Sequence, residues 1–386
     1  MLRLPTGGGD LLAWSPSHRT PTEPAPGGFA SRTAYAAAHV VADPTEDQAP
    51  DAGPPIDWET TLSFRRHLWS LGFGVAEAMD TAQRGSGVGW NTARELILRT
   101  ALEARSLGGS AVYGAMTDQL EPDRRATLTE IAQAYREQVS FIEEQGGTAI
   151  LMCSRHLAAV ASKPEDFTTV YNEVISASSR PVMIHWLGDA FDPALAGYWG
   201  SPDPYQAADT VLGLLEAHAG QVSGLKLSLL DADLEIGMRR RLPNGTTMLT
   251  GDDLNFVDLI LGDAEGHSDA LLGVFDPIAP VAAAAFQALD RGDVATYKSL
   301  LEPTIPMSRH LFSTPTFHYK TGVVFLAYLN GFQDHFRMVG GAESERSLPH
   351  LARLLVLADE AGLLSRPDLA EQRMRQILEL GGVPQP

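Results

Sequence analysis

The chain has 386 residues, of which 44% are hydrophobic and 20% are charged. It is therefore long enough for one large α/β barrel with additions, or for two domains. Acidic residues outnumber basic ones by 48 to 29, which gives a formal charge of −19, and no basic block offers a surface for phosphates. We therefore expect neither nucleic acid nor a membrane as a partner.

Two further features of the composition bear on the cellular compartment. The single cysteine, Cys153, permits no disulfide within the chain and suits a reducing compartment. The first residues lack a charged segment followed by an apolar run, and no apolar run is long enough to span a bilayer. We predict a cytoplasmic protein.

The first predicted element is a small hairpin. The segment RLPTGGGDLLAW places apolar runs on either side of a glycine-rich turn, which is typical of two paired strands. We assign residues 1–30 to this N-terminal hairpin and extension. Further along, the Pro, Asp and Gly residues of Asp43–Pro55 predict a loop after the first strand of the next domain.

From residue 31 to 291, apolar strand-like runs alternate with helical patterns. The predicted strands are Ala34–Val41, Gly74–Met79, Ala111–Met116, Ala149–Cys153, Val182–Leu187, Val222–Ser228, Thr247–Thr250 and Ala270–Val274. The predicted helices are Trp58–Trp69, Thr92–Ser106, Pro122–Gln145, Pro164–Ser178, Pro204–His218, Ala232–Arg241, Asp253–Leu261 and Pro277–Ala288. Thr92 and Glu95 have the spacing of a capping box, and proline opens several other helices.

Strict alternation of strand and helix predicts a parallel sheet, and eight such units predict closure into a (β/α)8 TIM barrel over residues 31–291. An open doubly wound sheet is the alternative, but no glycine-rich phosphate loop follows the first strand. After this region only helical patterns occur, and we predict a C-terminal helical extension over residues 292–386. Its helices are Val294–Phe312, His318–Phe336, Leu348–Ala361 and Pro367–Leu378.

The most informative residue is Lys226, in the segment QVSGLKLSLLD. The apolar run around it is typical of a buried parallel strand. Burying an ammonium group costs several kcal/mol unless it is paired or loses its proton, and burial lowers a lysine's pKa. A neutral lysine is the nucleophile that a Schiff base with a carbonyl compound requires. The alternative is a lysine at a strand end that reaches water or a carboxylate.

Five segments in order carry a resemblance to a known family. PVMIHWLG is similar to a fifth barrel strand, VSGLKLS to a strand bearing a Schiff-base lysine, and MLTGDD to an LSGDD strand. LLGVFDPIAP and RHLFSTPTFHYKTGVVFLAYLNGF match two later segments. From about Ile56 to Phe336 the chain thus resembles the dihydrodipicolinate synthase and N-acetylneuraminate lyase superfamily of class I aldolases. Within it, the chain is most similar to a divergent branch, the domain-of-unknown-function 993 group.

The resemblance implies that Lys226 forms the Schiff base and that His185 stands where the family has a proton-relaying tyrosine. Histidine exchanges protons near neutral pH, so this replacement is chemically reasonable. A histidine hydrogen-bonded in the core is the alternative. In a parallel barrel the chemistry lies at the C-terminal ends of the strands, and these two residues are our predicted catalytic pair.

The second strand departs from the family pattern, because its GTTGE motif appears here as Met79–Gln83. Thr81 matches the second threonine and is predicted to donate a hydrogen bond to the substrate. Asp80 places a carboxylate where the family has a hydroxyl. Two like charges about 4 Å apart repel by about 4 kcal/mol at an effective dielectric near 20. We therefore predict a substrate other than pyruvate in the usual pose, with Asp80 binding polyol-like hydroxyls or acting as an acid or base.

Four further positions are predicted to bind substrate. Arg155 and His156 follow the fourth strand where the family reads TPYY, and they are candidates for binding an anionic group and for proton transfer. The alternative for both residues is a solvent-facing position in a loop. Asp118 follows the third strand as a possible lining residue. Gly251 matches the LSGDD strand, although Gly251–Asp253 is also typical of a strand-to-helix turn with an acidic cap.

The leading interpretation is a Schiff-base aldolase, lyase or related dehydratase of carbohydrate metabolism that acts on a small sugar-derived keto or aldehyde compound without a cofactor. A metal-dependent sugar isomerase or aldolase is the second hypothesis, with Glu77, Asp80, His156 and His185 as ligands. A non-catalytic small-molecule sensor is the third. The resemblance also implies a homo-oligomer, either a dimer or a tetramer.

Overall fold

The structure is a computed structural model that describes residues 1–47, 53–122 and 124–386. Part of the predicted loop Asp43–Pro55 and one residue of the predicted helix Pro122–Gln145 lie outside the described residues. The chain forms two compact units. We call Arg32–Ala37 with Gly74–Leu272 the barrel unit, and Met1–Ser31, Ala38–Phe73 and Gly273–Pro386 the helical unit. Neither unit is contiguous in sequence, and the boundaries after residues 30 and 291 remain a prediction.

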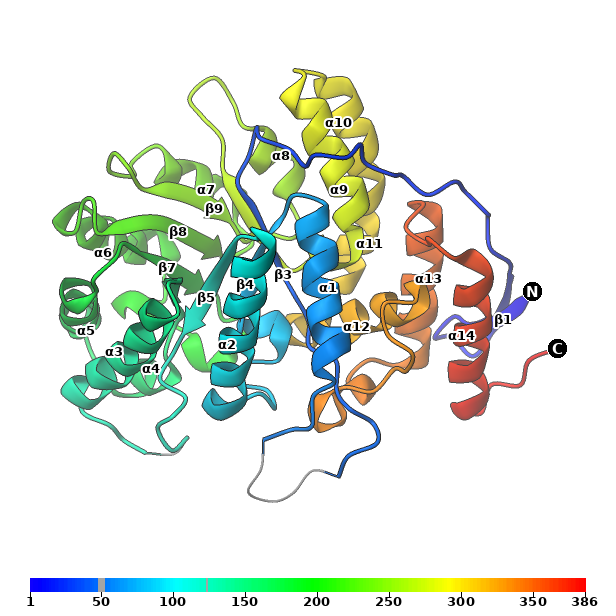
Figure 1. Ribbon diagram of the computed structural model, residues 1–386, viewed down its shortest axis with the longest axis horizontal. Coiled ribbons are helices and arrows are strands. Elements are labelled where there is room, and N and C mark those ends of the chain that lie inside the picture. The colour runs from blue at the N-terminus through cyan, green and yellow to red at the C-terminus, as the bar shows by residue number, and fades with distance from the viewer. Residues whose placement is uncertain (48–52, 123) are drawn as a thin grey trace. The chain divides into compact units, whose positions relative to one another are not determined.

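In the described part of the barrel unit, eight strands pair in parallel and close into a barrel in the order β10-β3-β4-β5-β6-β7-β8-β9. Figure 1 labels β3, β4, β5, β7, β8 and β9 of this barrel. The strands are β3 Ala34–Ala37, β4 Gly74–Glu77, β5 Ala111–Ala115, β6 Thr148–Leu151, β7 Val182–Leu187, β8 Val222–Ser228, β9 Thr247–Thr250 and β10 Asp269–Leu272. Each overlaps a predicted strand, and β7, β8 and β9 have the predicted bounds. The predicted (β/α)8 barrel is therefore confirmed.

Alternate residues along these strands fill the barrel interior, as the two-residue period of a strand requires. The inward side chains form one apolar cluster made of Tyr35, Ala37, Ala76, Met79, Val112, Ile150, Met152, Leu249 and Leu271. On β8 the inward position before the lysine is Gly224, where a side-chain carbon would lie 2.7 Å from Leu249 Cδ1. Lys226 and Ser228 follow at two-residue intervals and therefore face the same interior.

The helices of the barrel unit follow its strands in chain order. They are α2 Trp90–Leu107, α3 Leu128–Glu144, α4 Arg155–Val160, α5 Pro164–Ala177, α6 Pro204–Ala217, α7 Ala232–Arg239 and α8 Phe256–Leu261. The predicted capping box at Thr92 is wrong, because α2 begins at Trp90 after Gly89 and Thr92 lies inside the helix. A real capping box, Thr127 with Glu130, starts α3 and places its first residue later than the predicted Pro122. Helix α4 was not predicted.

The helical unit contains the predicted hairpin, with β1 Leu2–Pro5 antiparallel to β2 Leu11–Trp14. Its helices are α1 Trp58–Ser70, α9 Phe275–Asp290, α10 Val294–Leu301, α11 Ile305–Leu311, α12 Tyr319–Asn330, α13 Leu348–Glu360 and α14 Pro367–Leu380. The single predicted helix Val294–Phe312 is wrong, because a 3₁₀ turn at Glu302–Thr304 separates α10 from α11. Pro303 and Pro306 lack the amide hydrogens that a continuous helix would use.

Helix α12 ends six residues earlier than predicted, because Gly331 adopts a positive φ of 85° that terminates the helix. In the described part of the chain, no helix has both the length and the apolar composition needed to cross a bilayer.

A buried contact between a histidine and a carboxyl group within the helical unit joins residues 237 positions apart. The carboxylate of Asp276 accepts from the backbone amide of His39 at 2.9 Å and lies 2.7 Å from its ring Nδ1. The guanidinium of Arg65 is also buried and donates to the carbonyls of His39 and Thr61. Unpaired ionic groups are costly in such surroundings, so these contacts hold the segment after β3 to the start of α9.

Candidate active site

Lys226 lies on β8, the sixth strand of the barrel, and its side chain is only 4% exposed. Burial lowers the pKa of this lysine, and the negative charges of Asp80 and Asp253 partly offset that effect. None of the described residues forms an ion pair with its amine. The structure therefore places Lys226 on a buried strand, as its apolar surroundings in the sequence predicted, and burial there weakens its hold on the proton.

His185 pairs in register with Lys226 across the neighbouring strands β7 and β8, so both side chains point to the same face of the sheet. Its Nε2 lies 3.1 Å from the hydroxyl of Ser228, whereas its buried Nδ1 has no hydrogen-bond partner among the described residues. Burial, followed by the charge of Lys226, holds the pKa of His185 well below the usual histidine value. The imidazole is therefore neutral near pH 7 and can accept a proton.

Two carboxylates act on the charge of the lysine from different turns. Asp80 opens the 3₁₀ turn η1, Asp80–Ala82, directly after β4, and it is half-buried. Asp253 follows β9 and is 4% exposed. Both charges favour the protonated form of Lys226. Thr81 lies in the same turn as Asp80 and is buried.

Gly251 leaves room for the lysine. A side-chain carbon at this position would lie 2.0 Å from Ser228 Oγ and 3.0 Å from Lys226 Cε. Its backbone amide donates to the carbonyl of Leu227 at 2.8 Å, which continues the pairing of β9 with β8. Any side chain would clash with Ser228 and crowd the lysine, so Gly251 contributes space next to the lysine side chain. Asp252 accepts from the amides of the next residues and forms the predicted acidic turn.

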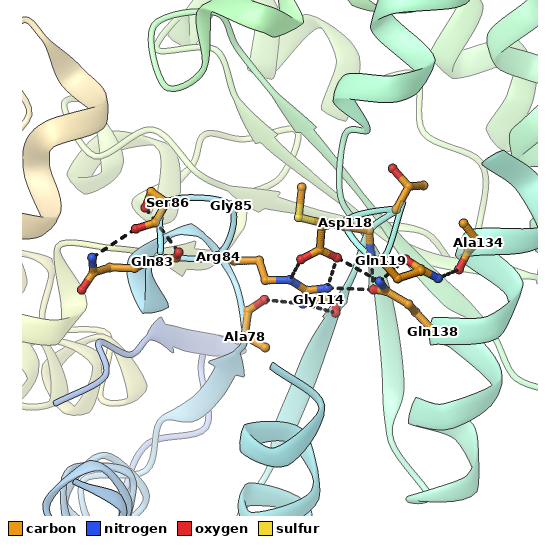
Figure 2. Close-up of polar contacts among 12 residues, drawn as sticks. Ala78, Gln83, Arg84, Gly85, Ser86, Gly114, Asp118, Gln119, Ala134 and Gln138 are labelled. Atoms are coloured by element: carbon orange, nitrogen blue, oxygen red, sulfur yellow. Dashed lines mark hydrogen bonds and ion pairs between the residues drawn. The ribbon is translucent and has the colours of Figure 1, made fainter. Parts of the chain in front are cut away.

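The predicted substrate ligand Asp118 is engaged by a buried arginine. Arg84 donates from Nε and Nη2 to the two carboxylate oxygens of Asp118 at 2.6 and 2.7 Å (Figure 2). Burial alone would raise the pKa of Asp118, but Arg84 and Gln138 outweigh it and hold that pKa below its usual value. Both oxygens are thus committed to an internal contact.

Arg155 and His156 open α4 and are likewise held by neighbours. Arg155 is half exposed and pairs with Asp192 at 2.6 Å. Nδ1 of His156 lies 3.0 Å from the Thr117 hydroxyl, and its Nε2 lies 3.0 Å from the carbonyl of Glu121. Their predicted roles in substrate binding remain predictions, and His156 would have to exchange an existing contact for one with the substrate.

The predicted metal ligands Glu77 and His156 each contact different protein groups. Glu77 accepts from the Ala78 amide and from the hydroxyl of Thr100 on α2, so its carboxylate lies between the barrel wall and a helix. His156 has the two contacts given above. In the described residues, no three His, Cys, Asp or Glu side chains are arranged to hold a metal ion together.

Another buried carboxyl, Glu235 on α7, contacts Thr250, the last residue of β9, directly before Gly251. It accepts from the hydroxyls of Thr250 at 2.9 Å and Ser268 at 2.7 Å. Burial raises its pKa to about 7, although these two hydroxyls act in the opposite direction. The same Thr250 oxygen accepts from the amide of Asp252, so Glu235 is joined to the turn that bears Asp253.

The raised pKa of Glu235 predicts a pH-dependent stability. Below pH 4.5, the ordinary pKa of glutamate, this carboxyl group is protonated in both the folded and the unfolded chain. Its contribution to the free energy of unfolding is then fully present. That contribution is lost as the pH rises through about 7, because the folded state must then bury the charge. The loss amounts to about 3 kcal/mol. In Glu235→Gln we expect a flatter dependence of the unfolding free energy between pH 5 and 8, measured by urea unfolding.

A matched control for this substitution is Glu216→Gln, on the exposed face of α6. It removes the same charge in the same unit and should keep the dependence of the unmodified protein. A Glu235→Gln protein that retains the native pH dependence would show that titration of Glu235 does not cause it.

Fold and site together define a TIM-barrel protein with a buried lysine on its sixth strand. The chain belongs to the family described as Protein of unknown function (DUF993), which matches residues 2–383. A comparison with curated protein sequences finds no match. The family resemblance read from the sequence is therefore confirmed.

Solved structures of the dihydrodipicolinate synthase family share the fold. A prophage protein of that family from E. coli K12, in complex with pyruvate, aligns with a TM-score of 0.66 at 15% identity, covering 86% of this chain and 99% of its own. The 4-hydroxy-tetrahydrodipicolinate synthase of Methylacidiphilum fumariolicum SolV gives 0.65 at 14% identity, covering 87% and 98%. Dihydrodipicolinate synthase from Thermotoga maritima gives 0.63 at 14%, covering 87% and 100%. At these identities the likeness establishes the fold.

Sequence reasoning missed several residues around the lysine. Ser228 was detectable, because it follows Lys226 by two positions on a strand and must share its face. Asp253 was assigned only to a turn, although its charge also acts on the lysine. Arg84 gave no signal, since the surrounding letters QRGSG are typical of an exposed loop.

Proposed function

We propose that the protein is a Schiff-base-forming lyase of the aldolase type, with Lys226 as the nucleophile. The single observation that carries this proposal is the buried amine on the sixth strand, with its lowered pKa and a neutral histidine in register beside it. The shared fold with dihydrodipicolinate synthases supports it. The cytoplasmic location and the homo-oligomer remain predictions.

In the first step, the neutral amine of Lys226 attacks the carbonyl carbon of the substrate. The carbonyl oxygen takes one proton from the attacking amine and one from solvent and leaves as water, and a positively charged iminium forms between the substrate carbon and Nζ. The charge that appears on the nitrogen lies in the field of Asp80 and Asp253, which favour a cation at this place. These carboxylates therefore stabilise the iminium after the burial of the amine has promoted its formation.

In the second step, His185 takes the proton of a hydroxyl on the β-carbon. The bond between the α- and β-carbons breaks, an aldehyde is released, and the electron pair moves into the iminium to give an enamine. The protonated His185 returns its proton to the α-carbon, and water then hydrolyses the imine and restores the amine. Neutral imidazole suits this cycle, because it is a base before cleavage and an acid after it.

The charges around the lysine favour a neutral, hydroxyl-rich carbonyl compound such as a sugar-derived ketone or aldehyde. Two carboxylates act on Lys226. The basic side chains Arg84 and Arg155 are paired with Asp118 and Asp192. A substrate carboxylate would thus meet repulsion from Asp80, whereas hydroxyl groups can donate to that carboxylate.

Borohydride trapping tests the function. The protein is incubated with neutral hydroxylated aldehydes and ketones, and separately with pyruvate, and is then reduced and analysed by peptide mass spectrometry. We expect a stable adduct on Lys226 with at least one neutral compound and little with pyruvate. Absence of any adduct across the whole panel would refute the Schiff-base function. Efficient labelling by pyruvate would refute the proposed substrate class alone.

The role of Asp80 in substrate choice predicts the behaviour of Asp80→Asn. Removing the charge should raise the trapping of pyruvate on Lys226 by about tenfold or more, because a repulsion of a few kcal/mol disappears. The ratio of pyruvate trapping to neutral-substrate trapping should therefore rise, since the amide also accepts hydroxyl hydrogen bonds less strongly than the carboxylate. Adduct yields at matched concentrations measure both effects. Asp209→Asn, on the surface of α6, is the control and should change neither yield.

A further inference from the structure

Arg84 is buried in the barrel unit, with a side-chain exposure of 0%. Its Nε and Nη2 contact Asp118, and Nη2 also donates to Gln138 Oε1 at 2.8 Å. Nη1 donates to the carbonyls of Ala78 at 3.2 Å and Gly114 at 3.3 Å. These five contacts match the five N–H groups of a guanidinium, and Figure 2 shows the side chain between the two carbonyls and the carboxylate.

The backbone that Arg84 holds is strained. Ala78 has a φ of +55° and Gln83 a φ of +59°, in the left-handed region that residues other than glycine rarely adopt. Such conformations cost about 1–3 kcal/mol each and persist only where surrounding contacts enforce them. The turn between these two residues begins with Met79 and contains Asp80 and Thr81. Arg84 donates a hydrogen bond directly to the carbonyl of Ala78, the first strained residue.

The opposite side of the network is anchored on α3. Gln138 donates from Nε2 to Asp118 at 2.9 Å and accepts from the amide of Met116 at 2.8 Å. A side-chain carbon on Gly114 would lie 2.7 Å from the carbonyl oxygen of Ala78, so glycine there permits the close approach. The turn after β4 is therefore fixed to β5 and α3 through one buried cation.

We propose that Arg84 is a positioning residue that fixes Asp80 beside the amine and thereby sets the reactivity of Lys226. The inference deepens the proposed function and rests on Lys226 being its nucleophile. The charged and titratable groups that act on this lysine come from three elements: Asp80 after β4, Asp253 after β9 and His185 on β7. Of these, only Asp80 lies in the turn that Arg84 holds, so displacement of this turn changes one contribution and leaves the other two.

The test measures the amine itself and needs no substrate. Competitive acetylation with acetic anhydride, followed by peptide mass spectrometry from pH 6 to 10, gives the reactivity of Lys226 relative to the exposed Lys163. Asp80→Asn should raise labelling of Lys226 at pH 7 by roughly three- to tenfold, because an opposite charge that favours the protonated amine is removed. Arg84→Lys keeps the positive charge but loses the planar guanidinium with its five N–H donors. It should also raise the labelling of Lys226 at pH 7.

Two further variants make the outcome decisive. Arg136→Lys is the matched control, since Arg136 forms an exposed pair with Glu173 on the outer face of α3 and α5, and its profile should equal that of the unmodified protein. Gln138→Met weakens the network without changing charge, and it replaces Arg84→Lys as the test if that variant does not fold. A smaller shift in the same direction is expected for it.

The proposal is overturned if Asp80→Asn leaves the profile unchanged, or if the folded Arg84 or Gln138 variant keeps the native profile while Asp80→Asn shifts it. Its failure is distinct from failure of the proposed function. Acetylation requires no imine, so absent borohydride adducts together with a shifted profile would refute the lyase and leave the positioning role standing.

Discussion

Replacing Lys226 with methionine is expected to abolish borohydride-trapped adducts and to lower turnover by roughly 10⁴-fold or more, because the nucleophile is lost. Methionine resembles the lysine stem in length and is apolar, so it suits a position that is 4% exposed. The variant should therefore fold. Adduct formation is followed by mass spectrometry with the neutral carbonyl compound that labels the unmodified protein, and folding by circular dichroism and urea unfolding.

Lys163→Arg is the control for this experiment, because Lys163 is exposed at the start of α5. It should retain trapping and turnover. Lys226→Arg adds a second comparison: it keeps a positive charge but cannot supply a neutral amine near pH 7. A folded Lys226→Met protein that still forms the reduced adduct would show that another group is the nucleophile.

The barrel was predictable from sequence because its strands are short apolar runs separated by helical patterns, a signal that needs no long-range information. The same holds for Lys226 on β8, whose charge within an apolar run marks it directly. Strand pairing then follows from topology, and with it the register that sets His185 beside the lysine. These features depend on local pattern plus the closure of eight parallel strands.

The rest of the site depends on contacts between distant segments. Arg84 lies 34 residues from Asp118 and 54 from Gln138, and nothing in its local sequence marks it as buried. Asp118 was predicted to line the site because it follows a strand, whereas its direction is decided by this partner. The pair His39 and Asp276 is separated by 237 residues and was likewise not predicted. Side-chain partners of this kind are set by tertiary packing, which a single sequence does not record.

The arrangement separates the tasks of the site among different groups. Burial and a cationic surrounding would each lower the pKa of a lysine, and here burial is the larger influence while two carboxylates oppose it. An amine balanced in this way can lose its proton to attack a carbonyl, yet the same carboxylates favour the iminium that results. In the proposed mechanism, Asp80 would thus both stabilise the iminium and disfavour an acidic substrate, which would link the mechanism to substrate choice.

His185→Gln is expected to separate imine formation from proton transfer. Glutamine keeps a polar side chain beside Ser228 but cannot take up a proton, so borohydride trapping on Lys226 should persist while turnover falls by about 10²–10⁴-fold. The same loss should appear in a simpler measurement without borohydride. NMR follows the exchange of α-hydrogens for deuterium in the carbonyl compound that labels Lys226. Enamine formation requires that transfer, whereas the imine itself does not.

The pH dependence sharpens this prediction. Because the pKa of His185 is held well below the usual histidine value, the imidazole stays neutral and remains a base when the pH falls from 8 to 6. Protonation of His185 should therefore not limit exchange by the unmodified protein in that range. Ser228→Ala removes the hydroxyl that lies 3.1 Å from Nε2 and should cost far less than the loss of the ring. Full exchange activity in His185→Gln would assign the proton transfer to another group, and Asp80, in the turn after β4, would then be the residue to substitute next.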